Sequence, residues 1–375
     1  MTELRRFDGA RATTLGFLLG VVLGPSAALA ESDRVSSSVM LYSDDSHVRV
    51  LATTIEGNKQ VGEAISASAA YTVDVVSAAS VDVVTSASPA GFEELRHQAR
   101  AAFEYDFGEG TKAGVDYGAS VEPDFVGHGV QATYAFDLLE RNVTLGFAYG
   151  FQLAAIGQSR ARTLEHERLG HDLSATFSQV LGQRTVADVG ASLGVATGYL
   201  ANPYRLVRVF EPEAANPSTA VPEALPDART SGSILLRVRQ ELLPSWHALL
   251  EYKLYSDDWG LMAHTAFMRQ TLGFLDDTVL VSAELRGYLQ GAADLYRARY
   301  ETFPNVPIHR SADKELGGMS SLLGGLDLEW SSQLDFADAL RLGLGLDVYG
   351  MSYDAYPALS GRLAFVGSFD VTLEI

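Results

Sequence analysis

Two short stretches of the sequence have residue types that could do hydrolytic chemistry. Gly190-Ala191-Ser192-Leu193-Gly194 matches G-x-S-x-G, in which a sharp strand-to-helix turn exposes a nucleophilic serine. The stretch lies within an alternating apolar pattern with no helix expected after it, so we predict that Ser192 lies in the middle of a strand. His166 and His171 resemble a zinc-protease pair, but they are five residues apart. That pattern needs a spacing of four to place both imidazoles on one helical face.

No other constellation predicts catalysis or metal binding. His264 follows Ser256-Asp257-Asp258 closely, but a solvated strand end is the simpler interpretation. Acidic residues at expected outer strand ends could bind Ca²⁺ or Mg²⁺ beside lipopolysaccharide, although solvated turns again explain them more simply. The remaining histidines are scattered without ligand spacing. We therefore predict no enzyme activity, no catalytic residue, no metal and no cofactor, and we keep an outer-membrane enzyme as the second alternative.

The first 30 residues have the layout of a secretory signal peptide. Arg5, Arg6 and Arg11 precede an apolar run over residues 15–23, and Ala28-Leu29-Ala30 supplies the small residues of a cleavage site. The run is too short for a spanning helix, which needs about 20 apolar residues. The absence of cysteine excludes a lipoprotein signal, disulfides and thiolate chemistry. We predict an exported protein whose mature part covers residues 31–375.

The charge balance excludes one class of partner. The chain has 28 Lys and Arg against 47 Asp and Glu, a formal net charge of −19. Nucleic-acid binding needs a basic surface, so we predict no nucleic-acid partner. No later segment holds a long apolar run, which leaves a secreted soluble protein or a β-barrel, whose strands are hidden from hydropathy.

Alternation of apolar and polar residues is the strongest structural signal. Val143, Leu145, Phe147, Tyr149, Phe151 and Leu153 alternate with small or polar residues, and similar patterns occupy most of the mature chain. This period indicates strands with one apolar and one polar face. The strands are about 10 to 15 residues long, carry full charges in the middle of the polar face, and include one that ends the chain. These features favour a membrane barrel over a soluble sandwich.

The connection lengths predict how many strands there are. We expect an all-β, transmembrane, antiparallel up-and-down β-barrel of about 16 strands, with 14 as the alternative. Four long connections, residues 78–92, 158–168, 199–229 and 291–318, all follow odd-numbered strands. Tight turns such as Gly57-Asn58-Lys59, Leu139-Glu140-Arg141-Asn142 and Asp276-Asp277 follow even-numbered ones, and a break at Ser43-Asp44-Asp45-Ser46 keeps the number of strands even. Since such barrels have short periplasmic turns and longer extracellular loops, this parity predicts that both termini are periplasmic.

The inward charges suggest a function. Opposite charges fall close together on one wall, and we predict that they line the lumen: Arg237, Arg239, Glu251, Lys253, Glu284 and Arg286. A barrel of this size can enclose water, so we favour a channel for small polar solutes or ions. A closed structural or partner-binding barrel is the alternative, because the long loops could cover the mouth and the inward charges could pair.

Several short stretches resemble an uncharacterised family of Gram-negative outer-membrane β-barrel proteins, catalogued as a domain of unknown function. The matching pieces occur in the family's order: Asp74–Ser80 with Thr85–Pro89, Asn202–Arg205, Ser256–Gly260 with His264-Thr265, Tyr288–Tyr296, and Asp313–Leu316. The resemblance implies an outer-membrane location and a barrel. It implies no activity, so it assigns no catalytic or binding residue.

The shared pieces fall at expected extracellular strand ends and loops, where function concentrates. We therefore select as extracellular candidates Asp74, Ser77, Ser80, Thr85, Ser88, Tyr204, Arg205, Asp257, Trp259 and His264. The repeated phrase VDVVSAAS and VDVVTSAS, residues 73–88, is interpreted as a strand end followed by an extracellular extension. The implied partners are outer-membrane lipid, lipopolysaccharide and the barrel-assembly machinery, and the oligomeric state is left open.

Overall fold

The computed structural model describes residues 33–78, 92–158, 163–302, 306–356 and 359–375. Sixteen strands form one closed barrel, which confirms the predicted fold class. They are β1 (Arg34–Asp44), β2 (Val48–Val61), β3 (Ile65–Ala78), β4 (Phe92–Gly108), β5 (Thr111–Glu122), β6 (Phe125–Leu138), β7 (Val143–Gln158), β8 (Thr163–Gly182), β9 (Thr185–Gly198), β12 (Ala228–Leu243), β13 (Trp246–Asp257), β14 (Met262–Phe274), β15 (Val279–Gln290), β17 (Met319–Leu334), β18 (Ala337–Tyr353) and β19 (Gly361–Glu374).

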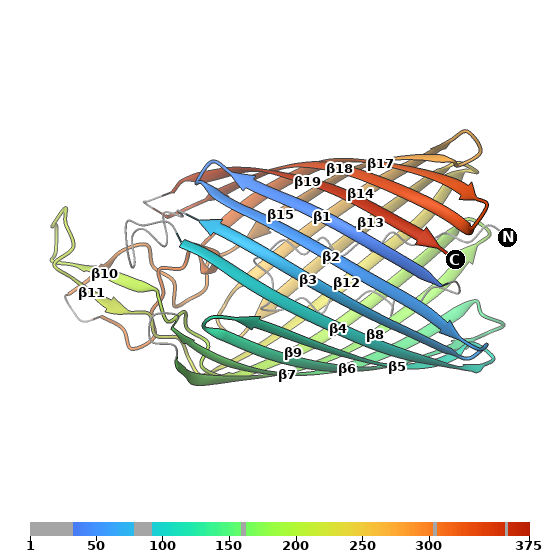
Figure 1. Cartoon of the computed structure of the whole chain (residues 1–375). Helices are drawn as coiled ribbons and strands as arrows, with labels where there is room; N and C mark the ends of the chain where they lie inside the picture. Colours follow the sequence, from blue (N-terminus) through green and yellow to red (C-terminus); the bar gives the residue numbers. More distant parts are fainter. Residues whose placement is uncertain (1–32, 79–91, 159–162, 303–305, 357–358) are drawn as a thin grey trace.

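Each strand pairs antiparallel with its neighbours, and β1 pairs with β19 to close the sheet. The long connections lie at one end of the barrel, where β10 (Leu206–Phe210) and β11 (Thr219–Pro222) project beyond the wall (Figure 1). The C-terminus lies at the opposite end (Figure 1). This arrangement separates a long-loop end from a short-turn end.

The alternation in the sequence appears as two faces of the wall. Large apolar side chains such as Leu41, Leu344 and Leu346 are more than half exposed on the outer face. Charged and hydroxyl side chains occupy the intervening positions and face inward. Among the described residues, no helix has the length and apolar character to cross a membrane.

Two short-turn hairpins use the same strained backbone. In Leu139-Glu140-Arg141 and in Leu275-Asp276-Asp277, all three residues have positive φ, between 51° and 67°. The amide of Asn142 donates to the Leu139 carbonyl at 3.1 Å, and that of Thr278 donates to Leu275 at 3.2 Å. Positive φ at the central residues matches the twist of tight hairpins. The sequence predicted turns at both places.

Two boundaries differ from the prediction. Gly57-Asn58-Lys59 is not a turn, because β2 continues to Val61: Gly57 and Asn58 pair with both neighbouring strands, and Lys59 pairs with Ala67 of β3. The turn follows instead at Gly62, where φ is +68°. The connection predicted at 158–168 is also shorter, because β8 begins at Thr163 and its polar residues pair with the end of β7. In both cases backbone pairing overrides a composition typical of turns.

The other predicted connections, 78–92, 199–229 and 291–318, correspond to the spans between β3 and β4, β9 and β12, and β15 and β17. The last two contain a small separate sheet of β11, β10 and β16 (Tyr300–Glu301). The predicted signal peptide and the second copy of the repeated phrase, at 81–88, lie outside the described residues.

Gly198 provides a test of the point where β9 leaves the wall. Its φ is +96°, and a Cβ there would overlap the carbonyl oxygen of Glu167. We expect Gly198→Ala to lower the free energy of unfolding by about 1–3 kcal/mol, since only glycine tolerates this backbone without strain. Urea unfolding followed by tryptophan fluorescence measures the change. Gly367→Ala is the matched control, because a Cβ at that strand position meets nothing within 4 Å; equal stability of the two variants would contradict the interpretation.

Candidate functional site

The predicted lumen-lining charges lie on the inner wall formed by β12 to β15. Along β12, Ile234, Leu236 and Val238 are exposed on the outer face, whereas Arg237 and Arg239 alternate with them and point inward. The same parity turns Glu251 and Lys253 of β13, and Glu284 and Arg286 of β15, toward the lumen. All six candidates therefore share one side of the sheet.

Most of these charges form ion pairs between neighbouring strands. Arg237 binds Glu251 across the β12–β13 register, and Arg239 reaches Asp188 of β9 at 2.8 Å. Glu284 accepts from Arg269 of β14, with the Nε atom at 3.0 Å. Other pairs of this kind are Arg100–Asp116, Lys112–Glu104 and Arg341–Glu374. A charge-assisted pair along the wall holds both side chains against the sheet.

Lys253 and Arg286 differ from the other four predicted lumen-lining residues in their lack of an ion pair with any described residue. Within the part of the chain that the structure describes, neither has an ion-pair partner. They lie on either side of β14, where Lys253 pairs with Thr265 and Arg286 pairs with Phe267. Two cationic heads are thus held on adjacent parts of the wall, and the carboxylate that acts on Lys253 from two residues away, Glu251, is itself in the ion pair with Arg237.

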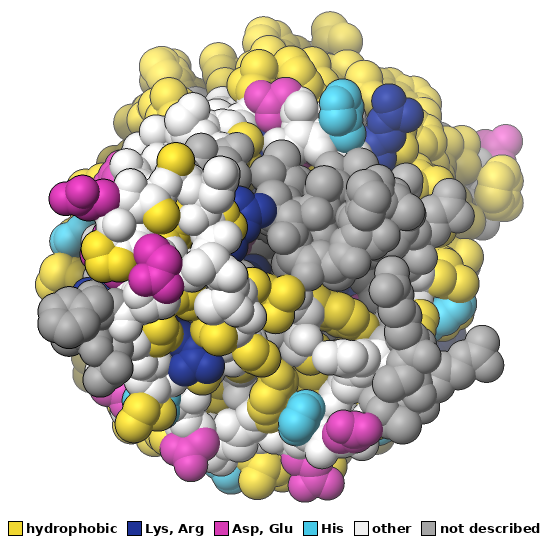
Figure 2. Space-filling model, turned by 90° about the vertical axis from the view of Figure 1, so that its left-hand side faces the viewer, with side chains coloured by type: hydrophobic (Ala, Val, Ile, Leu, Met, Phe, Trp, Pro, Cys, Tyr) yellow, Lys and Arg dark blue, Asp and Glu magenta, His cyan; other side chains and the backbone are white. Residues whose placement is uncertain are grey.

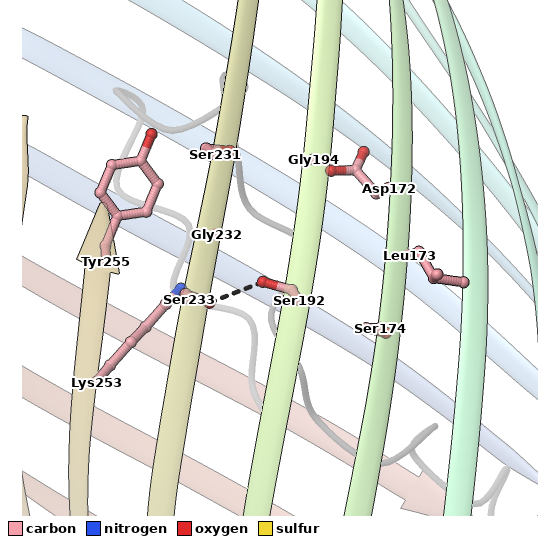
Figure 3. A pocket seen from close by; sticks show the side chains of 10 residues that line it. All are labelled: Asp172, Leu173, Ser174, Ser192, Gly194, Ser231, Gly232, Ser233, Lys253 and Tyr255. Carbon is pink, nitrogen blue, oxygen red and sulfur yellow. Dashed lines mark hydrogen bonds between the residues drawn. The ribbon is translucent and has the colours of Figure 1, made fainter. Parts of the chain in front are cut away.

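A hollow lined by hydroxyl groups adjoins Lys253 on the inner wall. Ser174, Ser192, Ser231 and Ser233 line it together with Asp172 and Tyr255 (Figure 3). The Ser192 and Ser233 hydroxyls lie 2.7 Å apart, and the Lys253 side chain extends toward Ser233 (Figure 3). This explains Ser192: it is a lumen-facing hydroxyl in the middle of a strand, as the sequence predicted.

Asp257 organises the hairpin between β13 and β14 at the long-loop end. Its side chain is fully buried and forms an ion pair with Arg229 of β12. Its Oδ1 atom accepts from the amides of Trp259 at 3.0 Å and Leu261 at 2.9 Å. The indole of Trp259 donates to the Ala228 carbonyl at 3.0 Å, and the Arg229 guanidinium lies 4.5 Å from the Trp259 ring centroid. Asp257 and Trp259 are therefore part of the support of this hairpin.

The hairpin between β1 and β2 repeats this arrangement with the same five residue types. Leu41-Tyr42-Ser43-Asp44-Asp45 matches Leu254-Tyr255-Ser256-Asp257-Asp258. Asp44 accepts from the amides of Ser46 and Val48, both at 2.9 Å, and from the Tyr42 hydroxyl at 3.0 Å. Arg362 of β19 supplies the cation at 3.2 Å. These two carboxylates are neutralised by arginine, so they are not positioned as cation ligands.

The other extracellular candidates are spread over the same end. Asp74 of β3 is buried and forms an ion pair with Arg96, while the side chain of Ser77 lies outside the described set, as do Ser80, Thr85 and Ser88. The Tyr204 hydroxyl donates to Asp124, and Arg205 binds Asp313 and lies 3.6 Å from Glu223. Figure 2 looks onto this end and shows Lys and Arg side chains lying deep among the surrounding atoms.

The small external sheet has its own packed core. Val207 and Val209 of β10 and Tyr300 of β16 are almost completely buried against one another. A second apolar cluster joins Trp259 to Tyr296 and Leu316 above the wall. Burial raises the pKa of the Glu223 carboxyl above its ordinary value, although Arg205 opposes the shift. Packing and buried polar contacts thus fix the long connections to the barrel mouth.

The histidine-containing stretches do not assemble a reactive site. His264 points to the outer face of β14, whereas Asp257 belongs to the inward face of β13. His166 stacks on Tyr199 with ring centroids 3.9 Å apart, but His171 lies on the opposite face of β8. Among the described residues, no group of three or more His, Asp and Glu is arranged to hold a metal ion.

Sequence reasoning missed four arginines that pair with the carboxylates described above: Arg96, Arg229, Arg269 and Arg362. Their partners are set by strand register, which connection lengths do not determine. The similar structure of the two hairpins at the mouth could have been predicted, because the five-residue repeat of Leu41–Asp45 and Leu254–Asp258 is visible in the sequence. The pairing of Arg362 with Asp44 needs the closure of the barrel, which joins residues from the two ends of the chain.

Comparisons with known proteins agree with this architecture. A family model described as "Protein of unknown function (DUF3570)" matches residues 154–370. No curated protein matches the sequence. A solved structure described as a bacterial polysaccharide outer membrane secretin superposes with a TM-score of 0.51 at 11% identity, covering 92% of this chain and 98% of that one. OprD from Pseudomonas aeruginosa superposes with a TM-score of 0.44 at 8% identity, covering 92% and 95%. At such low identity, the first similarity supports the fold of an outer-membrane β-barrel and nothing finer.

The Asp257 cluster yields a direct test. Removing one partner of a buried ion pair leaves an uncompensated charge, which costs about 3–5 kcal/mol. We expect Asp257→Asn to lower the free energy of unfolding by about 3 kcal/mol, measured by urea titration with tryptophan fluorescence. Asp258→Asn is the matched control, because Asp258 is the next residue along the chain and is exposed. We expect this variant to change the free energy of unfolding by no more than about 0.5 kcal/mol. Similar losses in both variants would show that the pair does not support the hairpin.

Proposed function

This chain belongs to the DUF3570 family of proteins of unknown function, and we propose that it forms an outer-membrane channel for small polar solutes. We propose that the channel prefers anions, because of the part of its inner wall that carries Lys253 and Arg286. The observation that carries the proposal is a pair of cations on the inner face of a closed barrel, Lys253 and Arg286, that have no ion-pair partner among the described residues. Charged side chains along a pore set its ion selectivity. Catalysis is not part of the proposal.

The neighbouring wall supports this function. The hydroxyl-lined hollow beside Lys253 offers hydrogen-bond donors and acceptors to a polar solute, as its seryl side chains face inward. The ion pairs below it keep Arg237, Arg239 and Arg269 against the wall. Below the ion pairs of the mouth, an anion descending the lumen would therefore reach Lys253 and Arg286 before the paired charges of the lower wall.

We also propose the location and partners that the sequence indicated. The exposed apolar outer face is what a bilayer requires of a barrel wall. The proposed arrangement places the long connections outside the cell and both termini in the periplasm, after removal of the signal peptide. Lipid, lipopolysaccharide and the barrel-assembly machinery would be the partners.

A partner-binding barrel is the second candidate. The sheet of β11, β10 and β16 favours it, because connections that only join strands do not require a sheet with a buried core of its own. The two candidates differ in conductance. Channel openings of the purified protein in planar bilayers would support the first candidate; no openings at any voltage would overturn it and leave the second.

Ion selectivity tests the role of the free cations. We expect the double variant Lys253→Gln, Arg286→Gln to lower the anion-to-cation permeability ratio by about twofold or more, because it removes two unpaired positive charges from the lumen wall. Reversal potentials in a KCl gradient measure the ratio. Arg49→Gln is the control, since Arg49 is exposed and belongs to the outward-facing set of β2. An unchanged ratio in the double variant would contradict the assignment.

A further inference from the structure

Four tyrosine–histidine pairs recur on the outer face of the barrel. In each, the tyrosine hydroxyl lies 2.7 or 2.8 Å from Nδ1 of a histidine on the next strand. The pairs are Tyr71–His97, Tyr117–His128, Tyr149–His171 and Tyr252–His264, here called the tyrosine–histidine girdle. They use half of the chain's eight histidines. All eight side chains lie on outward positions, where His97 and His264 are half-buried and the other six are exposed.

The four pairs have one geometry. In every hairpin the histidine lies opposite the residue two places after the tyrosine, such as Val73 opposite His97. The other three facing residues are Ala119, Phe151 and Leu254. The tyrosine side chain therefore leans diagonally toward the long-loop end, where the imidazole receives its hydroxyl.

The strand register places the pairs at one height. Ala99 lies opposite Tyr71 and pairs with Ala119, two residues beyond Tyr117. Val130 lies opposite Tyr117 and pairs with Phe151, two residues beyond Tyr149. Starting from Tyr149, the paired residues on successive strands are Leu173, Leu193, Gly232 and Ser256. Ser256 is four strands away and lies four residues beyond Tyr252. The offset is one residue per strand throughout, as tilted strands require of positions at equal height.

The girdle lies just inside the limit of the apolar wall. Moving two residues from each histidine toward the long-loop end reaches an apolar side chain: Leu95, Val126, Leu169 or Met262. Beyond Leu169, the next outward residue of β8 is the exposed Glu167. The imidazoles thus lie close to the polar boundary but are still flanked by apolar side chains. In a bilayer, this position corresponds to the region between the lipid headgroups and the acyl chains.

The hydrogen bonds define which ring nitrogen is free. Each tyrosine hydroxyl has one proton, and none of the four has another partner among the residues described. When that proton goes to Nδ1, the neutral imidazole carries its own proton on Nε2. Each pair then presents one N–H donor outward, held by the tyrosine in a fixed direction.

We propose that the girdle binds outer-leaflet lipid through hydrogen bonds from the four Nε2–H groups to acyl carbonyl oxygens. This rests on the proposed membrane location, but not on the channel. A carbonyl is the acceptor that fits, because the flanking residues are apolar and an Nε2–H group is a hydrogen-bond donor. Donors at a single height on β4, β6, β8 and β14 suit a planar lipid layer better than one protein patch.

The test compares lipids with and without the acceptor. The full-length protein is folded into vesicles of a diester phosphatidylcholine and of the diether lipid with the same chains, which lacks carbonyl oxygens. We expect the wild type to have a higher urea midpoint in the diester bilayer. In the variant His97→Phe, His128→Phe, His171→Phe, His264→Phe, which keeps the apolar ring surface, the difference between the two lipids should fall to a small remainder.

Further variants separate the outcomes. His171→Phe alone should remove roughly a quarter of the ester–ether difference, which keeps the test available if the fourfold variant fails to fold. His247→Phe should leave it unchanged, because His247 belongs to the inward face of β13. An ester–ether difference that is the same in wild type and histidine variants would overturn the girdle proposal alone. Failure of the wild type to insert into either vesicle would instead overturn the membrane location.

Discussion

Closure of the backbone ladder is the constraint on which the structure depends. A strand in lipid has no water to satisfy its amides and carbonyls, so each must pair with a neighbour, and a sheet with edges would leave two rows unpaired. The pairing of β1 with β19 removes both edges. Once the sheet is closed, each residue faces either the lumen or the surroundings, and period-two alternation assigns chemistry to the two faces.

Most of the barrel could be predicted because alternation and connection length are local properties. The break at Asp44-Asp45 kept the strand number even, and the structure has β1 and β2 on either side of it. The errors arose where local composition conflicts with pairing. Gly57 and Asn58 are typical of turns, yet both residues pair with β1 on one side and β3 on the other. The residues before Leu169 are polar, yet β8 begins at Thr163 because its partner β7 extends as far.

The inner wall was predictable as a set of charges but not as a set of pairs. Parity alone turns Arg237, Lys253 and Arg286 inward. Which of them is neutralised depends on register: Arg237 faces Glu251 directly, whereas Lys253 faces Thr265 and Arg286 faces Phe267. For His264 and Asp257 the sequence favoured a solvated strand end over a shared site, and parity places the two side chains on opposite faces of the wall.

The distribution of charge connects the mouth to the wall below it. At the mouth, arginines on adjacent strands hold the buried carboxylates of Asp44 and Asp257, and each carboxylate also accepts two turn amides. Those groups are committed to the hairpins and have little capacity left for a solute. Lys253 lies on the same strand as Asp257 but lacks such a partner. In the channel that we propose, Lys253 and Arg286 are therefore the inward charges available to a solute, because the charges above and below them are held in ion pairs.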